Sequence, residues 1–142
     1  MGQYRLTVRP GYRARISVAF ATRNENGLII SLFTTAQVVA NFGNWRKIGD
    51  TWVQDNSGGS WVSPDNLSEV AVLYVIHGVS KRTPPRDESP WNESDIQVLF
   101  ASETNILLGF EDNGWFSLKN PDIAERNDFN DVTVNILMER VQ

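Results

Sequence analysis

Apolar and polar residues alternate along much of this chain. The clearest case is residues 13–20, where Ala14, Ile16, Val18 and Phe20 alternate with polar residues. A period of two residues is typical of a strand that buries one face. Other alternating or apolar runs lie at residues 4–8, 28–33, 37–42, 51–54, 69–77, 95–102, 105–110 and 131–139. Many short runs of this kind predict an all-β protein, an antiparallel β-sandwich of about nine strands.

The segments between these runs carry turn residues. Residues 23–27 end in Asn-Gly, which predicts a β-hairpin between the runs on either side of them. Loops are predicted at residues 43–50, 56–60, 78–91 and 112–126, the last resembling an insertion. No linker, repeat or sustained helical period divides the chain, so we expect one domain over residues 1–142.

Composition and charge narrow the function. The chain has 142 residues, no cysteine and a net charge of −4. Without a long basic run, binding to a nucleic-acid backbone is not expected. No apolar run approaches the ~18 residues of a membrane span. The first residues lack the apolar core of a signal peptide, so a cytoplasmic location or export without a signal peptide is expected.

Oxygen-bearing side chains are concentrated at residues 127–131, Asn-Asp-Phe-Asn-Asp, just before the last apolar run. Crowded carboxylates repel one another unless a cation or hydrogen-bond donors lie between them. Carboxylate and amide oxygens are the ligands that calcium prefers. The chain must bend there for Asp128, Asn130 and Asp131 to converge, because a straight strand sends alternate side chains to opposite faces. The alternative is a solvated turn made of turn-favouring residues.

Catalytic motifs are scarce. The single histidine, His77, ends an apolar run and is expected to be a packed residue. No nucleophile elbow and no phosphate-binding glycine loop is present. Glu111 and Asp112 are adjacent, and because adjacent residues on a strand diverge we do not expect them to act as a glycosidase pair. The protein is therefore not expected to be an enzyme.

The C-terminal part resembles the small calcium-dependent fucose- and mannose-binding bacterial lectins. That family ends with an apolar strand, a Gly-x-Glu-Asp-Gly turn, an Asp-x-Asp-Tyr-Asn-Asp motif and a final strand. Here residues 105–114 read Asn-Ile-Leu-Leu-Gly-Phe-Glu-Asp-Asn-Gly, and after an insertion residues 126–136 read Arg-Asn-Asp-Phe-Asn-Asp-Val-Thr-Val-Asn-Ile. The first strands of the family are compatible with residues 6–33, so the resemblance spans nearly the whole chain.

The resemblance implies a β-sandwich that binds sugar through calcium. Its metal ligands correspond to Glu111, Asp128, Asn130 and Asp131 in this sequence. In that family these oxygens hold two neighbouring calcium ions, and sugar hydroxyls complete the metal coordination. The loop that sets sugar specificity in the family corresponds to residues 22–27, so Thr22, Arg23, Asn24 and Glu25 are the candidate sugar-binding residues.

Three departures from the family pattern affect the metal. Arg126 replaces the first motif aspartate, Thr22 replaces an asparagine ligand, and the chain does not end in the family's glycine. Two calcium ions bring +4, whereas the three carboxylates of the motif supply only −3. One ion is therefore expected rather than two, unless Asp122 or Glu125 supplies a further carboxylate. The alternative is a site without metal in which Arg126 pairs with Asp128 or with the glutamate of the turn.

Two functions follow. The first is a calcium-dependent, non-catalytic carbohydrate-binding protein for a fucose- or mannose-like sugar, expected to be a homo-oligomer because weak single-site binding gains from avidity. The second is a structural or assembly module with the same sandwich fold and either one structural calcium ion or a degenerate metal site. The ligand residues favour the first function, whereas Arg126 and the insertion favour the second.

Overall fold

The computed structural model describes residues 2–81, 90–112 and 129–142. Within these ranges the chain forms twelve β-strands and no helix, which confirms the predicted all-β fold with more strands than the nine expected. The strands are β1 (Gln3–Val8), β2 (Tyr12–Phe20), β3 (Glu25–Leu32), β4 (Val38–Gly43), β5 (Trp45–Ile48), β6 (Thr51–Gln54), β7 (Gly59–Val62), β8 (Val72–Lys81), β9 (Asn92–Glu93), β10 (Asp95–Ala101), β11 (Asn105–Glu111) and β12 (Val132–Arg140). None of the described residues belongs to a helix that could cross a membrane.

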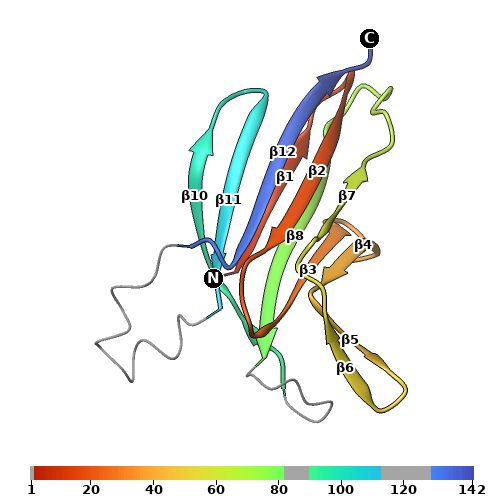
Figure 1. Ribbon diagram of the computed structural model, residues 1–142. Coiled ribbons are helices and arrows are strands. Elements are labelled where there is room, and N and C mark those ends of the chain that lie inside the picture. Colours follow the sequence, from red (N-terminus) through yellow and green to blue (C-terminus); the bar gives the residue numbers. More distant parts are fainter. Residues whose placement is uncertain (1, 82–89, 113–128) are drawn as a thin grey trace.

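The strands form an antiparallel sandwich. Sheet A has the order β1-β8-β3-β4, and β9 also pairs with β8; sheet B has the order β10-β11-β12-β2-β7. The remaining strands, β5 and β6, form a separate two-stranded sheet. Figure 1 shows the two large sheets as facing layers, with the β5–β6 hairpin projecting at the end where β8 finishes and β3 begins.

The hydrophobic core lies between the two sheets. All four apolar residues that the alternation placed on one face of β2 are buried, with at most 5% of their surface exposed. The neighbouring strand β12 continues this inner face, because Val134 lies opposite Val18 and Ile136 lies opposite Ile16. Buried residues of β1, β3 and β8 complete the cluster from sheet A. This apolar burial provides most of the free energy that holds the sheets together.

Gly78 of β8 allows sheet A to approach sheet B closely. A Cβ atom at residue 78 would lie 2.4 Å from Cδ1 of Phe110, whose side chain is fully buried. Atoms at that distance overlap, so only glycine is compatible with this position of the ring. The contact holds the end of β11 against β8, and the residue after Phe110 is Glu111.

Several predicted connections are wrong. β2 and β3 do not form a hairpin: β2 pairs with β12 and β7, whereas β3 pairs with β4 and β8. The Asn-Gly pair lies within β3 rather than in a turn, so the chain crosses from one sheet to the other before it. The predicted loop at residues 43–50 contains β5, and β8 continues to Lys81 beyond the expected end at His77.

Candidate metal centre

Three carboxyl groups meet at the end of the sandwich where β11 finishes and β12 begins. Glu111 is the last residue of β11, Asp112 follows it, and Asp131 directly precedes β12. One oxygen atom of each carboxyl lies within 4.8 Å of the other two. Glu111 and Asp112 are each only 2% exposed. The strands next to them are neighbours, because β11 and β12 pair in antiparallel register.

A bend at Phe129 brings Asp131 to the other two carboxyl groups. Phe129 has a φ angle of 55°, a left-handed conformation that is uncommon for a residue other than glycine. The carbonyl of Phe129 lies directly over Gly109, where a Cβ atom would be only 2.0 Å from its oxygen. The backbone N–H of Asp112 then donates to Oδ2 of Asp131 at 3.0 Å. The predicted bend therefore lies at Phe129, and of the three residues expected to converge there it brings Asp131 to the cluster.

The carboxylate of Asp112 is held from sheet A. Thr22 Oγ1 donates to Asp112 Oδ2 at 2.5 Å, and Asn26 Nδ2 donates to the same oxygen at 2.8 Å. In the part of the chain that the structure describes, Oδ1 of Asp112 and Oδ1 of Asn26 are buried and accept no hydrogen bond. Buried acceptors nearly always have a partner. A cation, which both oxygens could bind, would satisfy them.

The loop before β3 is fixed by side-chain hydrogen bonds. Asn44, which is fully buried, donates from Nδ2 to the carbonyl of Asn24 at 2.9 Å and accepts the backbone N–H of Asn26 at 2.7 Å. Gln54 and Trp45 also donate to carbonyl oxygens of this loop. Because its backbone acceptors are occupied in this way, the loop has a defined position beside the carboxyl cluster.

The geometry of the cluster suits one calcium ion. Calcium binds oxygen at about 2.3–2.6 Å, so two ligands on opposite sides of one ion are at most about 5 Å apart. The oxygens of Glu111, Asp112 and Asp131 lie within this limit. Three carboxylates bring a charge of −3, which one divalent ion largely balances. These residues could hold a metal ion without rearrangement of the strands.

Without a cation, the cluster favours a bound proton. Burial, hydrogen bonding to Glu111 and Asp112, and the charge of Asp112 together raise the pKa of Asp131 from 3.8 to about 9. The Asp112 N–H acts in the opposite direction, because it stabilises the ionised carboxylate. A proton and a metal ion would therefore compete for the same group of oxygens.

We expect the stability of the calcium-free protein to fall as the pH rises from about 4 to about 9. Across this window the folded state binds more protons than the unfolded state, because the folded pKa of Asp131 is raised above its ordinary value. Calcium replaces the proton, so its stabilising effect should grow with pH. Calcium affinity should rise by up to about tenfold per pH unit. Melting curves of chelator-stripped protein at pH 5.5, 7 and 8.5, with and without calcium, check both trends. If the melting temperature of the calcium-free protein rose across this pH range, the expectation would be contradicted.

Comparisons with known proteins identify the fold. No protein-family model matches the sequence, and no curated protein sequence matches it. Among solved structures, the C-terminal domain of the BC2L-C lectin of Burkholderia cenocepacia matches with a TM-score of 0.52 and 13% identity, over 93% of this chain and 91% of that chain. The chain has a lectin fold. The resemblance that the C-terminal motif indicated is confirmed at the level of the fold.

Two further lectin structures match at lower scores. The Chromobacterium violaceum lectin CV2L, solved in complex with alpha-methyl-fucoside, gives a TM-score of 0.48 at 16% identity, over 96% of this chain and 94% of that chain. The high-affinity mannose-binding lectin of Ralstonia solanacearum gives a TM-score of 0.46 at 18% identity, over 96% of this chain and 94% of that chain.

The lectin fold brings together part of the predicted metal site. Of the four predicted ligands, Glu111 and Asp131 lie in the cluster, whereas Asn130 is exposed. Their role as ligands stays a prediction. The other residues considered for the site lie outside the described ranges: Asp122, Glu125, Arg126 and Asp128.

The four predicted sugar-binding residues have different environments. Thr22 contacts the cluster through Asp112, and Arg23, the next residue, is exposed. Asn24 uses its carbonyl and N–H groups to hold the loop. Glu25 is 7% exposed and begins β3 rather than lying in a turn, so most of its surface is covered.

The sequence did not predict Asp112 as part of the cluster, nor Asn26 as the residue that donates to it. The expectation that Glu111 and Asp112 diverge is wrong, because β11 ends at Glu111 and the alternation of a strand does not continue to Asp112. The sequence Glu-Asp-Asn-Gly at residues 111–114 is a turn signal, and a turn could place the carboxyl groups of Glu111 and Asp112 on the same side of the chain. Asn26 had been assigned to a turn, and no sequence signal connected it with Asp112.

Proposed function

We propose that the protein is a calcium-dependent carbohydrate-binding protein without catalytic activity. The observation that supports this proposal is the carboxyl cluster of Glu111, Asp112 and Asp131, which lies in a lectin fold beside the loop that holds Thr22. One calcium ion bound there would be held by these carboxylates, with the amide oxygen of Asn26 as a further ligand. Asp128 and Asn130 stay proposed ligands from the motif, and the whole chain is proposed to act as one domain.

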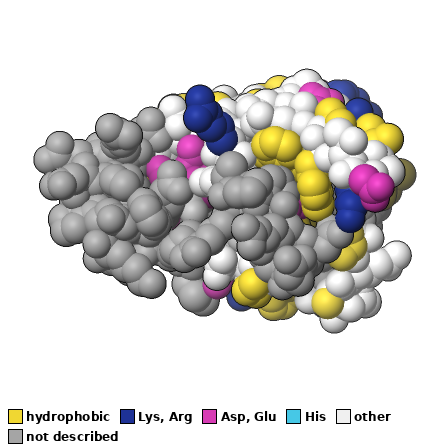
Figure 2. Space-filling view, turned by 60° about the horizontal axis from the view of Figure 1, so that its bottom comes forward, with side chains coloured by type: hydrophobic (Ala, Val, Ile, Leu, Met, Phe, Trp, Pro, Cys, Tyr) yellow, Lys and Arg dark blue, Asp and Glu magenta, His cyan; other side chains and the backbone are white. Residues whose placement is uncertain are grey.

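A sugar would bind at the same end of the sandwich. Figure 2 looks onto this end and shows acidic and hydrophobic side chains on its visible surface. A bound calcium ion takes six to eight oxygens. If each of the three carboxylates gives one oxygen, positions remain on the ion, and two neighbouring sugar hydroxyls could complete its coordination. The fucose- or mannose-like class of sugar follows from the C-terminal motif, and hydroxyl geometry at the ion would select it.

A calcium titration followed by a glycan array tests the proposal. Isothermal titration calorimetry on chelator-stripped protein should show stoichiometric calcium binding. The calcium-loaded protein should then bind fucose- or mannose-terminated glycans on the array, and a chelator should abolish the signal. Calcium binding with a blank array would reject the carbohydrate-binding proposal.

The Arg23→Ala variant should change sugar preference and leave calcium binding intact. Arg23 is exposed and directly follows Thr22, which contacts the cluster. Its carbonyl is held by Trp45 Nε1 at 2.9 Å and is unaffected by the substitution. Loss of one hydrogen bond to a hydroxyl should change the ratio of sugar affinities by about two- to tenfold. Calorimetry with methyl mannoside and methyl fucoside measures the ratio. Arg46→Ala, an exposed arginine on the β5–β6 hairpin, is the matched control; an equal change in both variants would contradict the role of Arg23.

The alternative function is a structural or assembly module. It is favoured by the burial of Glu111 and Asp112, because an ion enclosed by residues that are 2% exposed could serve the fold alone. In that case calcium should stabilise the protein by mass action while no glycan binds. The array with and without chelator distinguishes the two functions.

We also propose that the protein is a homo-oligomer. Val98, Leu99 and Phe100 are all more than 40% exposed on β10, which is an edge strand of sheet B. An exposed apolar edge of this kind is a suitable contact between subunits. Several sugar sites in one assembly would raise the overall affinity for a surface that displays many glycans.

A further inference from the structure

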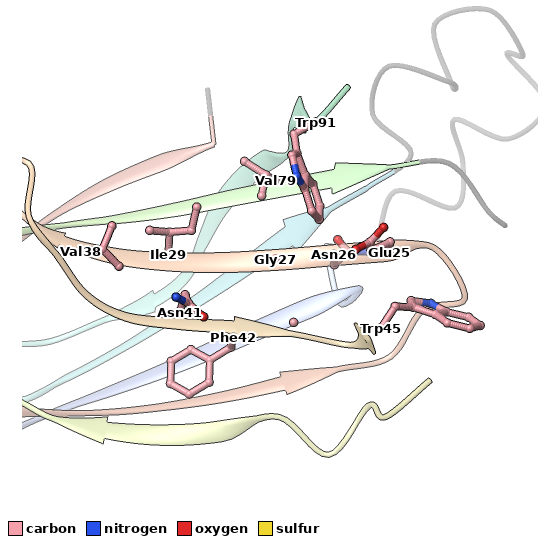
Figure 3. Close-up of a pocket in the computed structure, with 11 residues that line it drawn as sticks. Glu25, Asn26, Gly27, Ile29, Val38, Asn41, Phe42, Trp45, Val79 and Trp91 are labelled. Carbon is pink, nitrogen blue, oxygen red and sulfur yellow. The ribbon is translucent and has the colours of Figure 1, made fainter. Parts of the chain in front are cut away.

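A groove crosses the outer face of sheet A close to the carboxyl cluster. It has a volume of about 470 Å³, and its floor is formed by Gly27 of β3 and Gly43 of β4, which lie directly opposite each other. Because neither residue has a side chain, a ligand could approach the backbone of both strands. Figure 3 shows Trp91 and Val79 on one side of this floor and Trp45 at the end where β3 begins.

The tryptophans give the groove aromatic walls with fixed positions. Trp91 is 46% exposed and its Cη2 atom would be 3.9 Å from a Cβ on Gly27. The ammonium group of Lys81 lies 4.5 Å from the centre of the Trp91 ring, which holds the ring in place by a cation–π contact. The indole N–H of Trp45 donates to the carbonyl of Arg23, so this ring is held by the proposed sugar-binding loop.

Polar side chains also line the groove, Glu25 at the start of β3 and Asn41 opposite Ile29. Glu25 lies opposite Lys81 across the β3–β8 pair. The next residue, Asn26, borders the groove and donates from its side chain to Asp112 of the carboxyl cluster. The groove and the cluster therefore lie on the two sides of the first residues of β3.

We propose that this groove binds the second unit of an oligosaccharide whose first unit is held at the carboxyl cluster. A pyranose ring has an apolar face of C–H groups that packs on an aromatic ring, and hydroxyls around its edge that hydrogen-bond to carboxylate and amide groups. The groove offers both, since Trp91 and Trp45 flank a glycine floor and Glu25 and Asn41 supply acceptors. Ligand sites typically combine such apolar walls with a few polar groups. This inference rests on the proposed carbohydrate-binding function.

Calorimetry with paired sugars tests the groove. The probes are methyl α-mannoside with an α-linked mannobiose, and methyl α-fucoside with a fucose-terminated disaccharide, all on calcium-loaded protein. For the sugar type that binds, the disaccharide should bind about three- to tenfold more tightly than the monosaccharide, as expected for one aromatic packing contact.

Two variants remove the groove in different ways. Trp91→Ala deletes one wall, and Gly43→Leu fills the floor, where a Cβ atom meets no atom closer than Asn26 O at 3.6 Å. Both should abolish the advantage of the disaccharide and leave monosaccharide affinity unchanged. Trp52→Ala, a partly exposed tryptophan of the β5–β6 hairpin that does not line the groove, is the control and should keep the advantage.

The outcomes separate this inference from the function on which it rests. Monosaccharide binding without a disaccharide advantage, or an advantage that survives both Trp91→Ala and Gly43→Leu, overturns the second subsite and leaves the carbohydrate-binding function standing. If neither monosaccharide nor disaccharide binds to the calcium-loaded wild-type protein, the proposed function fails, and the inference fails with it.

Discussion

The Asp131→Asn variant is expected to be more stable than the wild-type protein in the absence of calcium and to lose the response to calcium. Asparagine has nearly the same shape as a protonated aspartate, and its carbonyl can still accept the Asp112 N–H. Since the pKa of Asp131 is raised to about 9, folding at neutral pH requires this carboxyl to take up a proton, which costs free energy. The uncharged asparagine side chain removes that cost. We expect a gain of about 1–3 kcal/mol in the free energy of unfolding at pH 7.5.

Calcium should stabilise the wild-type protein and have little effect on the variant. The wild-type melting temperature should rise when calcium is added, because an ion bound only to the folded state stabilises it. In Asp131→Asn one of the three carboxylates of the cluster is lost, and calcium affinity should fall at least about tenfold because the charge of the ligands sets it. Asp50→Asn, at an exposed turn position, is the control and should leave both values unchanged. A variant that is destabilised without calcium, or that keeps the full calcium response, would contradict this account.

The regular part of the fold follows from local sequence. β2 and β12 alternate strictly, and their inner residues are the core because a period of two can bury only one face. β5 was not predicted because its four residues face mostly solvent and leave no apolar alternation. The β2–β3 hairpin was predicted wrongly because Asn-Gly usually marks a tight turn. Here the glycine lies opposite Gly43 in a sheet pair, and the asparagine side chain binds Asp112.

The candidate metal site could be predicted only in part from the sequence. Glu111 and Asp131 could be paired because the strands that carry them are consecutive in the motif and pair in space. Asp112 could not, because its direction depends on where β11 ends rather than on residue type. Asn26 joins the cluster only because the chain crosses from sheet B to sheet A before β3. Such contacts depend on tertiary arrangement, which local alternation does not encode.

The Gly109→Ala variant is expected to lose calcium binding and to be destabilised by about 3 kcal/mol or more. The added Cβ atom would lie 2.0 Å from the carbonyl oxygen of Phe129 and 2.9 Å from Cδ1 of Leu99. The first of these is a backbone atom, so relief requires movement of the whole segment that leads to Asp131. That movement would take Asp131 away from the other two carboxyl groups, although no ligand has been changed.

Gly43→Ala is the matched control for Gly109→Ala, because it makes the same substitution in a strand where the new Cβ atom has room. It should keep the wild-type calcium response and nearly the wild-type melting temperature. Urea unfolding measures the loss of stability, and calorimetry measures calcium affinity. If Gly109→Ala bound calcium as tightly as the wild-type protein, the contact between Gly109 and Phe129 would not be what positions Asp131. Because the variant keeps every ligand, loss of calcium binding would show that the path of the backbone over Gly109, as much as the carboxylates themselves, makes the site.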